Sequence, residues 1–384
     1  MRKHLLYIAM SGLLAGGLFA CQQDVPGMEP LDEEARRIYL SAGVGDAVSS
    51  RTPYHPGGSE PTVSHPLNVS VWASTTPDIF PNEGENGSND IVAIHTKAHF
   101  QSGAPQLLGE AIYPKAQTVY FVGLHPLSSS DNSWTATSGN KDAQFTFTGK
   151  EDVMFAPQIH GQYNTAYHQS PQFHFYHLLT WLRIEMVAYL GEDEENSTSL
   201  TEDQKKLKRE HVSKAWGKIT ALTLKNQKNI ITISNLGDAT SSNYTSYVTF
   251  APESSDVPCS LYYAGTDDVF PGTNGYEIPV NQTEAAYVLC APVVGIEKDA
   301  YEVPKPEYIL HIETEHREMD IPLDLKGDEG NLFTGSTMGR MFNILLRFKM
   351  GDLISVSTEI SVGGDADWFT HGTGSGDLEE DDLK

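Results

Sequence analysis

The feature that most constrains the fold is a succession of short runs in which apolar and polar residues alternate. Turn-forming residues, mainly Gly, Pro, Asn, Asp and Ser, separate each run from the next. The runs begin roughly every ten to fifteen residues, with almost no helical periodicity between them, which is typical of an all-β protein. Examples from the first half of the chain are "LNVSVWAST", "IVAIHTKAHF", "EAIYP", "TVYFVGLHP" and "AQFTFTG".

A second series of such runs follows a charged stretch, and the length of 384 residues favours two domains. We expect two antiparallel β-sandwich domains of the transthyretin-like, Greek-key type in tandem, at 52–190 and 216–384. The longest apolar run, "FHFYHLLTWLRIEMVAYL" at 173–190, contains Arg183 and Glu185. We therefore interpret it as one central strand rather than a membrane span.

The charged stretch at 191–215 breaks the strand pattern and connects the two series. Thr201 followed by Gln204 resembles a capping box, in which each side chain satisfies a backbone N–H at the start of a helix. The pattern predicts a short charged helix over 202–215 with a solvated surface.

The cleanest alternation lies near the end of the chain. Two alternating runs on either side of a Gly-Asp pair predict a tight β-hairpin. The first run presents Phe342, Ile344, Leu346 and Phe348, and the second presents Ile354, Val356, Thr358, Ile360 and Val362. An acidic tail follows Trp368.

The first residues predict export. Arg2 and Lys3 precede an apolar segment that is too short and too rich in glycine for a stable membrane span. The segment ends in "LFAC", which resembles a bacterial lipoprotein box, so residues 1–20 would be the signal peptide and Cys21 the lipidated first residue. The alternative is an ordinary signal peptide that happens to contain a cysteine. If Cys21 is lipidated, its acyl chains hold the protein at a membrane.

The charge balance excludes one class of partner. The chain has 51 acidic and 26 basic residues and a formal net charge of -25. Nucleic acids and anionic membrane surfaces attract basic proteins, so we expect no nucleic-acid partner.

Residues that carry chemistry are sparse. The sequence contains no nucleophile elbow, zinc-protease motif, phosphate-binding loop or dinucleotide fingerprint, and we expect no enzyme, no cofactor and no metal site. Four histidines, at 160, 168, 174 and 177, are close in sequence, but positions three apart on a strand point to opposite faces. We interpret them as ordinary strand and loop histidines. Cys259 and Cys290 could form a disulfide or remain two buried thiols.

An early strand ends before an isolated arginine. In "RRIYLSAGVGDAVSSRTPYHPGG", Ile38, Leu40, Ala42 and Val44 recur at every second position, as in a half-buried strand. Small residues and then prolines surround Arg51.

This layout resembles the fimbrillin (Mfa-like) family, the type V pilins. The resemblance rests on the lipoprotein box, the early strand before "SSRT", the two β-rich halves and the terminal hairpin before "DW". It also rests on the stretches "FHFYHLLTWLRIEM", "WGKITALTLKN" and "MFNILLRFKM". It covers nearly the whole chain, but no invariant catalytic signature supports it.

The resemblance implies a fimbrial subunit, structural or adhesive, that is exported as an outer-membrane lipoprotein and then incorporated into a cell-surface fimbrium. Segment 21–51 would be a propeptide, and an arginine-specific protease would cut at Arg51 and remove the first strand. A strand from another pilin subunit would then fill the groove. Ile354, Val356, Thr358, Ile360 and Val362 would form the donor strand. The exact cleavage site stays open, because Pro53 follows Arg51 by two residues and because Arg36 and Arg37 are competing sites.

Two alternatives stay open. Arg51 could be a plain loop arginine beside a permanent edge strand. The chain could also be a monomeric outer-membrane surface lipoprotein that binds glycan or a host protein, since its 17 tyrosines and 5 tryptophans could stack on sugars.

Overall fold

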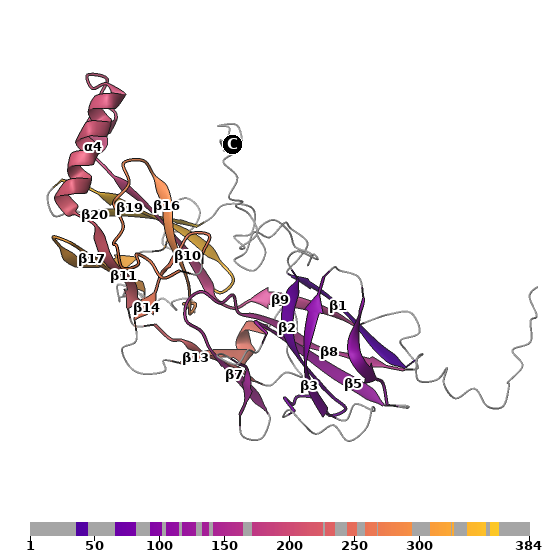
Figure 1. The fold of residues 1–384 in the computed structure, drawn as a ribbon. Helices are drawn as coiled ribbons and strands as arrows, with labels where there is room; N and C mark the ends of the chain where they lie inside the picture. Colours follow the sequence, from indigo (N-terminus) through magenta and orange to yellow (C-terminus); the bar gives the residue numbers. More distant parts are fainter. Residues whose placement is uncertain are drawn as a thin grey trace, which may run out of the picture.

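The protein belongs to the all-β class, with few helices (Figure 1). The structure, a computed structural model, describes residues 36–44, 66–81, 93–101, 105–114, 117–127, 133–137, 141–163, 171–225, 227–234, 244–251, 258–266, 268–293, 308–323, 325, 336–350 and 354–360. Within these ranges the strands form four sheets. Figure 1 shows an elongated molecule with the largest sheet at one end and helix α4 at the other.

The largest sheet has seven strands. Their order across the sheet is β3 (Ala93–Phe100), β2 (Leu67–Ser74), β5 (Thr118–His125), β8 (Met154–Gln162), β9 (Gln172–His177), β1 (Arg37–Val44) and β4 (Gln106–Ile112). Buried side chains from all seven strands gather in one cluster, here called the N-terminal core. Because the edge strands contribute Phe100 and Leu108 to the same cluster, the sheet curls around its core.

Two further sheets lie at the other end of the molecule. The five-stranded sheet runs β15 (Tyr262–Tyr263), β16 (Thr283–Cys290), β10 (Thr180–Ala188), β19 (Met341–Phe348) and β20 (Ile354–Ile360). The four-stranded sheet runs β14 (Cys259–Ser260), β11 (Ile219–Lys225), β17 (Tyr308–Thr314) and β18 (Glu318–Leu323).

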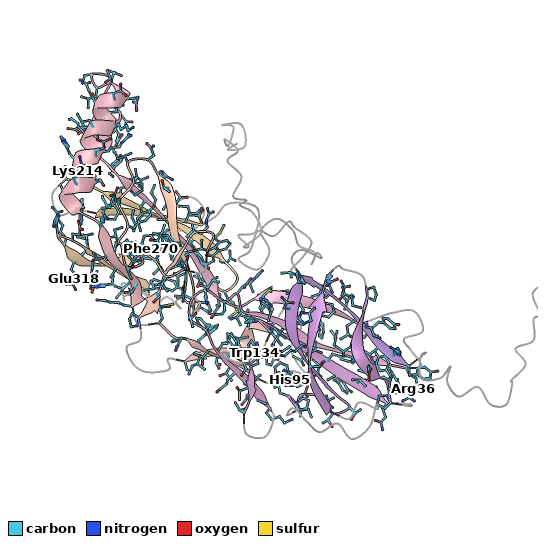
Figure 2. All side chains as sticks on the ribbon, viewed as in Figure 1. Arg36, His95, Trp134, Lys214, Phe270 and Glu318 are labelled. Carbon is cyan, nitrogen blue, oxygen red and sulfur yellow. The ribbon has the colours of Figure 1, made fainter. Side chains whose placement is uncertain are left out.

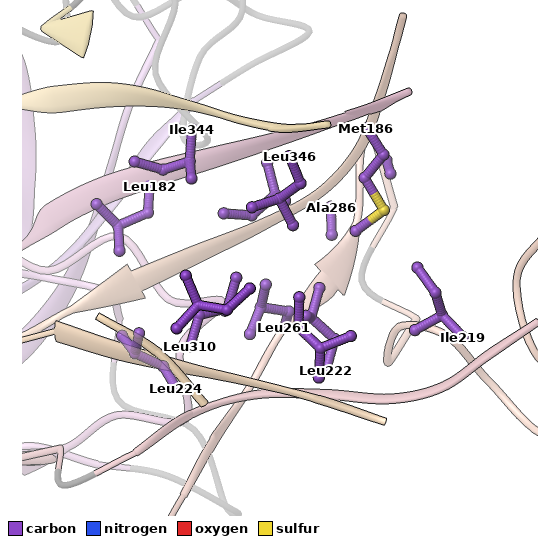
Figure 3. Close-up of a cluster of buried hydrophobic side chains, with 14 of the residues drawn as sticks. Leu182, Met186, Ile219, Leu222, Leu224, Leu261, Ala286, Leu310, Ile344 and Leu346 are labelled. Carbon is purple, nitrogen blue, oxygen red and sulfur yellow. The ribbon is translucent and has the colours of Figure 1, made fainter. Parts of the chain in front are cut away.

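A single hydrophobic cluster connects these two sheets. In Figure 3, Leu182 and Ile344 lie on one side of it and Leu224 and Leu310 on the other. All four side chains are fully buried. The alternation predicted for the last hairpin is confirmed in β19, where Phe342, Ile344, Leu346 and Phe348 are all fully buried.

The middle of the molecule holds the fourth sheet. Its order is β13 (Val248–Ala251), β12 (Ile230–Ser234), β7 (Asp142–Thr146) and β6 (Thr135–Ala136), and the short 3-10 helix η2 (Tyr244–Tyr247) precedes β13. Its core includes Trp72 from the seven-stranded sheet and Leu289 from the five-stranded sheet. This cluster therefore packs the two ends of the molecule against each other.

The long apolar run at 173–190 differs from the expectation of one central strand. It divides at Leu178 and Leu179 into β9, in the seven-stranded sheet, and β10, in the five-stranded sheet. Both strands have a neighbour on each side, so both are interior strands. Buried and more exposed residues alternate in both strands, and the break falls where His177, Leu178, Leu179 and Thr180 are buried in succession.

The predicted helix is confirmed as α4 (Glu202–Trp216), and α3 (Glu192–Glu195) precedes it. Thr201 and Gln204 form the reciprocal capping box. The Arg209 Nε donates to Glu195 Oε1 at 3.0 Å, which attaches α4 to α3. At the other end, the buried Trp216 indole donates to the backbone carbonyl of Lys349 at 2.8 Å and anchors the helix on the sheet.

Strand pairing departs from the expected antiparallel pattern in two places. β1 pairs in parallel with β9, and β10 pairs in parallel with β19. Parallel neighbours need long connections, and here the paired strands are far apart in sequence. Moreover, β10 and β7 pair with strands that follow the expected connection at 191–215. The division into 52–190 and 216–384 remains a prediction.

Candidate functional site

The candidate site is the position of β1 within the seven-stranded sheet. β1 is an interior strand, with β9 on one side and β4 on the other. Its first half pairs antiparallel with β4, where Leu40 lies opposite Gln106. Its second half pairs in parallel with β9, where Ala42 lies opposite Phe173. In the described residues β1 is therefore an interior strand, and not the permanent edge strand that one alternative interpretation expects.

One face of β1 is fully covered. Ile38, Leu40 and Ala42 are 0% exposed and Val44 is 2% exposed, and all four belong to the N-terminal core. On the opposite face Tyr39 is 41% exposed. Each fully buried aliphatic side chain contributes roughly 1.5–3 kcal/mol, so β1 is a substantial part of this core.

The start of β1 is fixed by a reciprocal pair of hydrogen bonds. The Tyr113 N–H donates to the Arg36 carbonyl at 2.8 Å, and the Arg36 Nε donates to the Tyr113 carbonyl at 2.7 Å. Arg36 is 7% exposed, and Arg37 is the first residue of the paired strand. Both arginines are thus held in folded structure, whereas Arg51 lies outside the described residues.

Removing β1 would leave two different vacancies. Backbone N–H and C=O groups of β9 and β4 would lose their partners, and unpaired buried backbone groups are costly. The apolar contacts of Leu108, Phe173 and Phe175 with the rest of the core would also be opened. An added strand could restore both the hydrogen bonds and the burial, as in β-strand addition.

The predicted donor segment lies at the opposite end of the chain. β20 forms the predicted hairpin with β19, with Val356 opposite Leu346 and Ile360 opposite Phe342. It is the last strand of its sheet in the described residues, so its second backbone edge has no strand neighbour there. Val362 and Cys21 lie outside the described residues, and the donor role remains a prediction.

The histidines predicted to be ordinary are not brought together where they are described. His174 is exposed on β9, and the buried His177 bonds through Nδ1 to Asp152 at 2.9 Å. His168 lies outside the described residues. Cys259 and Cys290 are two free, buried thiols, and burial raises the pKa of Cys259 to about 12.

Sequence reasoning missed a polar cluster on the hairpin of β17 and β18. His311, Glu313 and Glu318 can offer one ligand atom each, and these atoms lie within 4.8 Å of one another. The segment "YILHIETEHREMDI" held a usable signal, because His311 and Glu313 are two residues apart and share one face of a strand.

Among the helices that the described ranges contain, none is long and apolar enough to cross a membrane.

No protein-family model matches the chain, and no curated protein matches it either. Several solved structures are similar to it. A candidate cell adhesion protein from Bacteroides uniformis has 14% identity and a TM-score of 0.43, covering 86% of this chain and 98% of its own. A fimbrial assembly protein from Parabacteroides distasonis has 11% identity and a TM-score of 0.34, with coverages of 84% and 94%.

The tip fimbrial protein Mfa3 from Porphyromonas gingivalis has 9% identity and a TM-score of 0.33, covering 84% of this chain and 98% of its own. These TM-scores are too low to support an inference about what this chain does.

Proposed function

We propose that the chain is a cell-surface fimbrial subunit, structural or adhesive, that assembles by exchange of its first strand. The observation that carries the proposal is the position of β1: an interior strand with a fully buried face, located on the N-terminal side of Arg51. A cut after Arg51 would separate this strand covalently from every other strand of its sheet. The groove left by β1 would then accept a replacement strand in which apolar and polar residues alternate as they do in β1.

The environment of the three candidate arginines favours a cut at Arg51. A protease binds its substrate as an extended segment, and such cleavage concentrates in accessible loops. Arg36 is held by its hydrogen bonds with Tyr113, and Arg37 is paired with β4. Cutting at either arginine therefore requires β1 to detach first. Small and proline residues around Arg51 suit a loop substrate.

The donor in this proposal is the segment Ile354–Val362 of another subunit. An edge strand at the end of a terminal hairpin can leave its sheet at a smaller cost than an interior strand, because it gives up one ladder instead of two. In the precursor, the lipid on Cys21 would anchor the chain to the outer membrane until the cut releases it. No catalytic step by the subunit itself is needed.

Two double variants test the donor strand. By the two-residue period, Val356 and Ile360 would lie on the inserted face, so changing both to Asp removes about 3–6 kcal/mol from each junction. The polymer ladder on an unheated gel should disappear. Because Val356 and Ile360 also lie opposite the buried Leu346 and Phe342 of β19, the monomer should melt at a lower temperature but remain folded at the assay temperature. The matched control changes Ser355 and Ser357 to Asp and should retain the ladder.

Thermal melting of both monomers completes the test. If the variant with Asp at 356 and 360 is unfolded at the assay temperature while the control is folded, the subunit's own core requires this strand and the donor is another segment. If the cleaved parent protein and both variants all stay monomeric, the chain is a monomeric surface lipoprotein instead.

A further inference from the structure

The hairpin of β17 and β18 places like charges opposite each other. Glu313 on β17 lies directly opposite Glu318 on β18, and His311 lies opposite Asp320. Two carboxylates facing each other across an antiparallel pair are destabilising, unless a positive charge lies between them. His311 Nε2 lies close to both carboxylates, at 3.1 Å from Glu313 Oε1 and 3.8 Å from Glu318 Oε1.

The two distances from Nε2 bracket the spacing of ligands around one metal ion, and all three ligand atoms lie within 4.8 Å of one another. Zn²⁺ binds imidazole nitrogen and carboxylate oxygen at about 2.0–2.2 Å in tetrahedral geometry, which separates neighbouring ligand atoms by about 3.3–3.5 Å. The Glu313 and Glu318 side chains are 46% and 71% exposed, so both carboxylates can adjust toward an ion. The His311 side chain is only 12% exposed and supplies a fixed point.

The histidine is oriented from behind by a third carboxylate. Asp320 Oδ1 lies 2.7 Å from His311 Nδ1, so Nδ1 can donate to Asp320. Nε2 lies within hydrogen-bond distance of Glu313 Oε1, at 3.1 Å, and a metal ion would replace the proton between these two atoms. Metal-binding histidines are commonly oriented by a carboxylate in this way. Lys225 in turn holds Asp320, with Nζ 2.8 Å from Oδ2. Asp320 is therefore directed at the ring and not at the ion.

We propose that His311, Glu313 and Glu318 bind a divalent transition-metal ion of the Zn²⁺ type. An imidazole ligand favours Zn²⁺, Co²⁺ or Ni²⁺ over Ca²⁺ and Mg²⁺, which prefer oxygen ligands alone. Three protein ligands leave a tetrahedral position open for water or for a side chain of another molecule. Bound metal would remove the repulsion between the two glutamates.

The site is separate from β1. Figure 2 labels Glu318 and Arg36 at opposite ends of the molecule. Metal binding therefore does not depend on the proposed strand exchange, and either proposal can fail without the other.

Titration of ZnCl₂ into the untagged chain at neutral pH, followed by isothermal calorimetry, tests the proposal. We expect His311→Ala to abolish one Zn²⁺ equivalent or to weaken its binding at least about tenfold. His211→Ala changes an exposed histidine on α4 and should leave this equivalent intact. Excess Mg²⁺ should not displace the ion.

Glu318→Gln guards against loss of binding through unfolding, because its side chain is highly exposed. This variant should melt as the parent does without metal and should also lose the Zn²⁺ equivalent. Co²⁺ should give visible d–d absorption of a tetrahedral site in the parent and not in His311→Ala. The proposal is wrong if the parent binds no Zn²⁺, or if His311→Ala and Glu318→Gln bind as His211→Ala does.

Discussion

Truncation of Leu40 measures how strongly β1 is held. Leu40 is 0% exposed, lies opposite Gln106 of β4, and packs into the N-terminal core. Leu40→Ala removes a fully buried side chain from the N-terminal core, which costs about 2–5 kcal/mol in cores of this kind. The matched control is Tyr39→Ala on the exposed face of the same strand, where we expect a smaller change.

The assay follows urea unfolding of the part of the molecule that contains β1, with and without cleavage after Arg51. In the uncut chain, Leu40→Ala should lower the midpoint for this part well below that of the control. After cleavage, the loss of 2–5 kcal/mol should weaken retention of the severed strand by at least about 30-fold. The fragment should then separate from the variant during sizing before it separates from the parent.

Two results would refute the reasoning. Equal midpoints for Leu40→Ala and Tyr39→Ala would mean that β1 contributes little to the core. Equal retention of the severed strand in the variant and the parent would mean that its release is not governed by this buried face.

Three further outcomes are expected from single sites. Gly149 has φ of +107° and an added Cβ would lie 2.6 Å from the Cys259 sulfur, so Gly149→Ala should cost about 1–3 kcal/mol in thermal unfolding; an unchanged melt contradicts this packing. Burial raises the thiol pKa of Cys259 and of Cys290, so iodoacetamide at pH 8 should label neither until denaturant is added, and rapid native labelling contradicts their burial. Hydrogen bonding to Arg209 lowers the pKa of Glu195, so this pair stabilises the fold above the ordinary pKa of 4.5 and less as pH falls through the lowered value. Arg209→Ala should therefore reduce the melting temperature at pH 7 and have little effect at pH 2, and an equal effect at both contradicts the pairing.

Local sequence patterns predicted where strands and helices lie better than they predicted which strands pair with each other. The alternation of Ile38, Leu40, Ala42 and Val44 correctly indicated a strand, and Thr201 with Gln204 correctly placed a helix start. Such signals depend only on residues near in sequence. Which strands pair depends on contacts that are distant in sequence. The pattern around β1 therefore could not show that β9 would be its parallel neighbour.

The same limit explains the missed sites. The run at 173–190 is rich in apolar residues and has no Gly, Pro, Asn or Asp, so no turn residue marked the step at Leu178 from one sheet to another. His311 and Glu313 share a strand face by their spacing alone, but Glu318 joins them only through the register of the hairpin. The roles of Cys21 in lipidation, Arg51 in cleavage and Val362 in the donor strand rest on sequence patterns and the family resemblance, and they remain predictions.

The most direct test of strand exchange uses the purified chain from residue 21 onward, cut after Arg51 and examined by sizing. The account predicts that fragment 52–384 loses the severed strand and forms oligomers. A synthetic peptide of residues 36–50, added in excess, should occupy the vacancy and keep the fragment monomeric, whereas a scrambled peptide should not. A fragment that stays monomeric with neither peptide present, or oligomers that form regardless of the 36–50 peptide, would contradict exchange of β1.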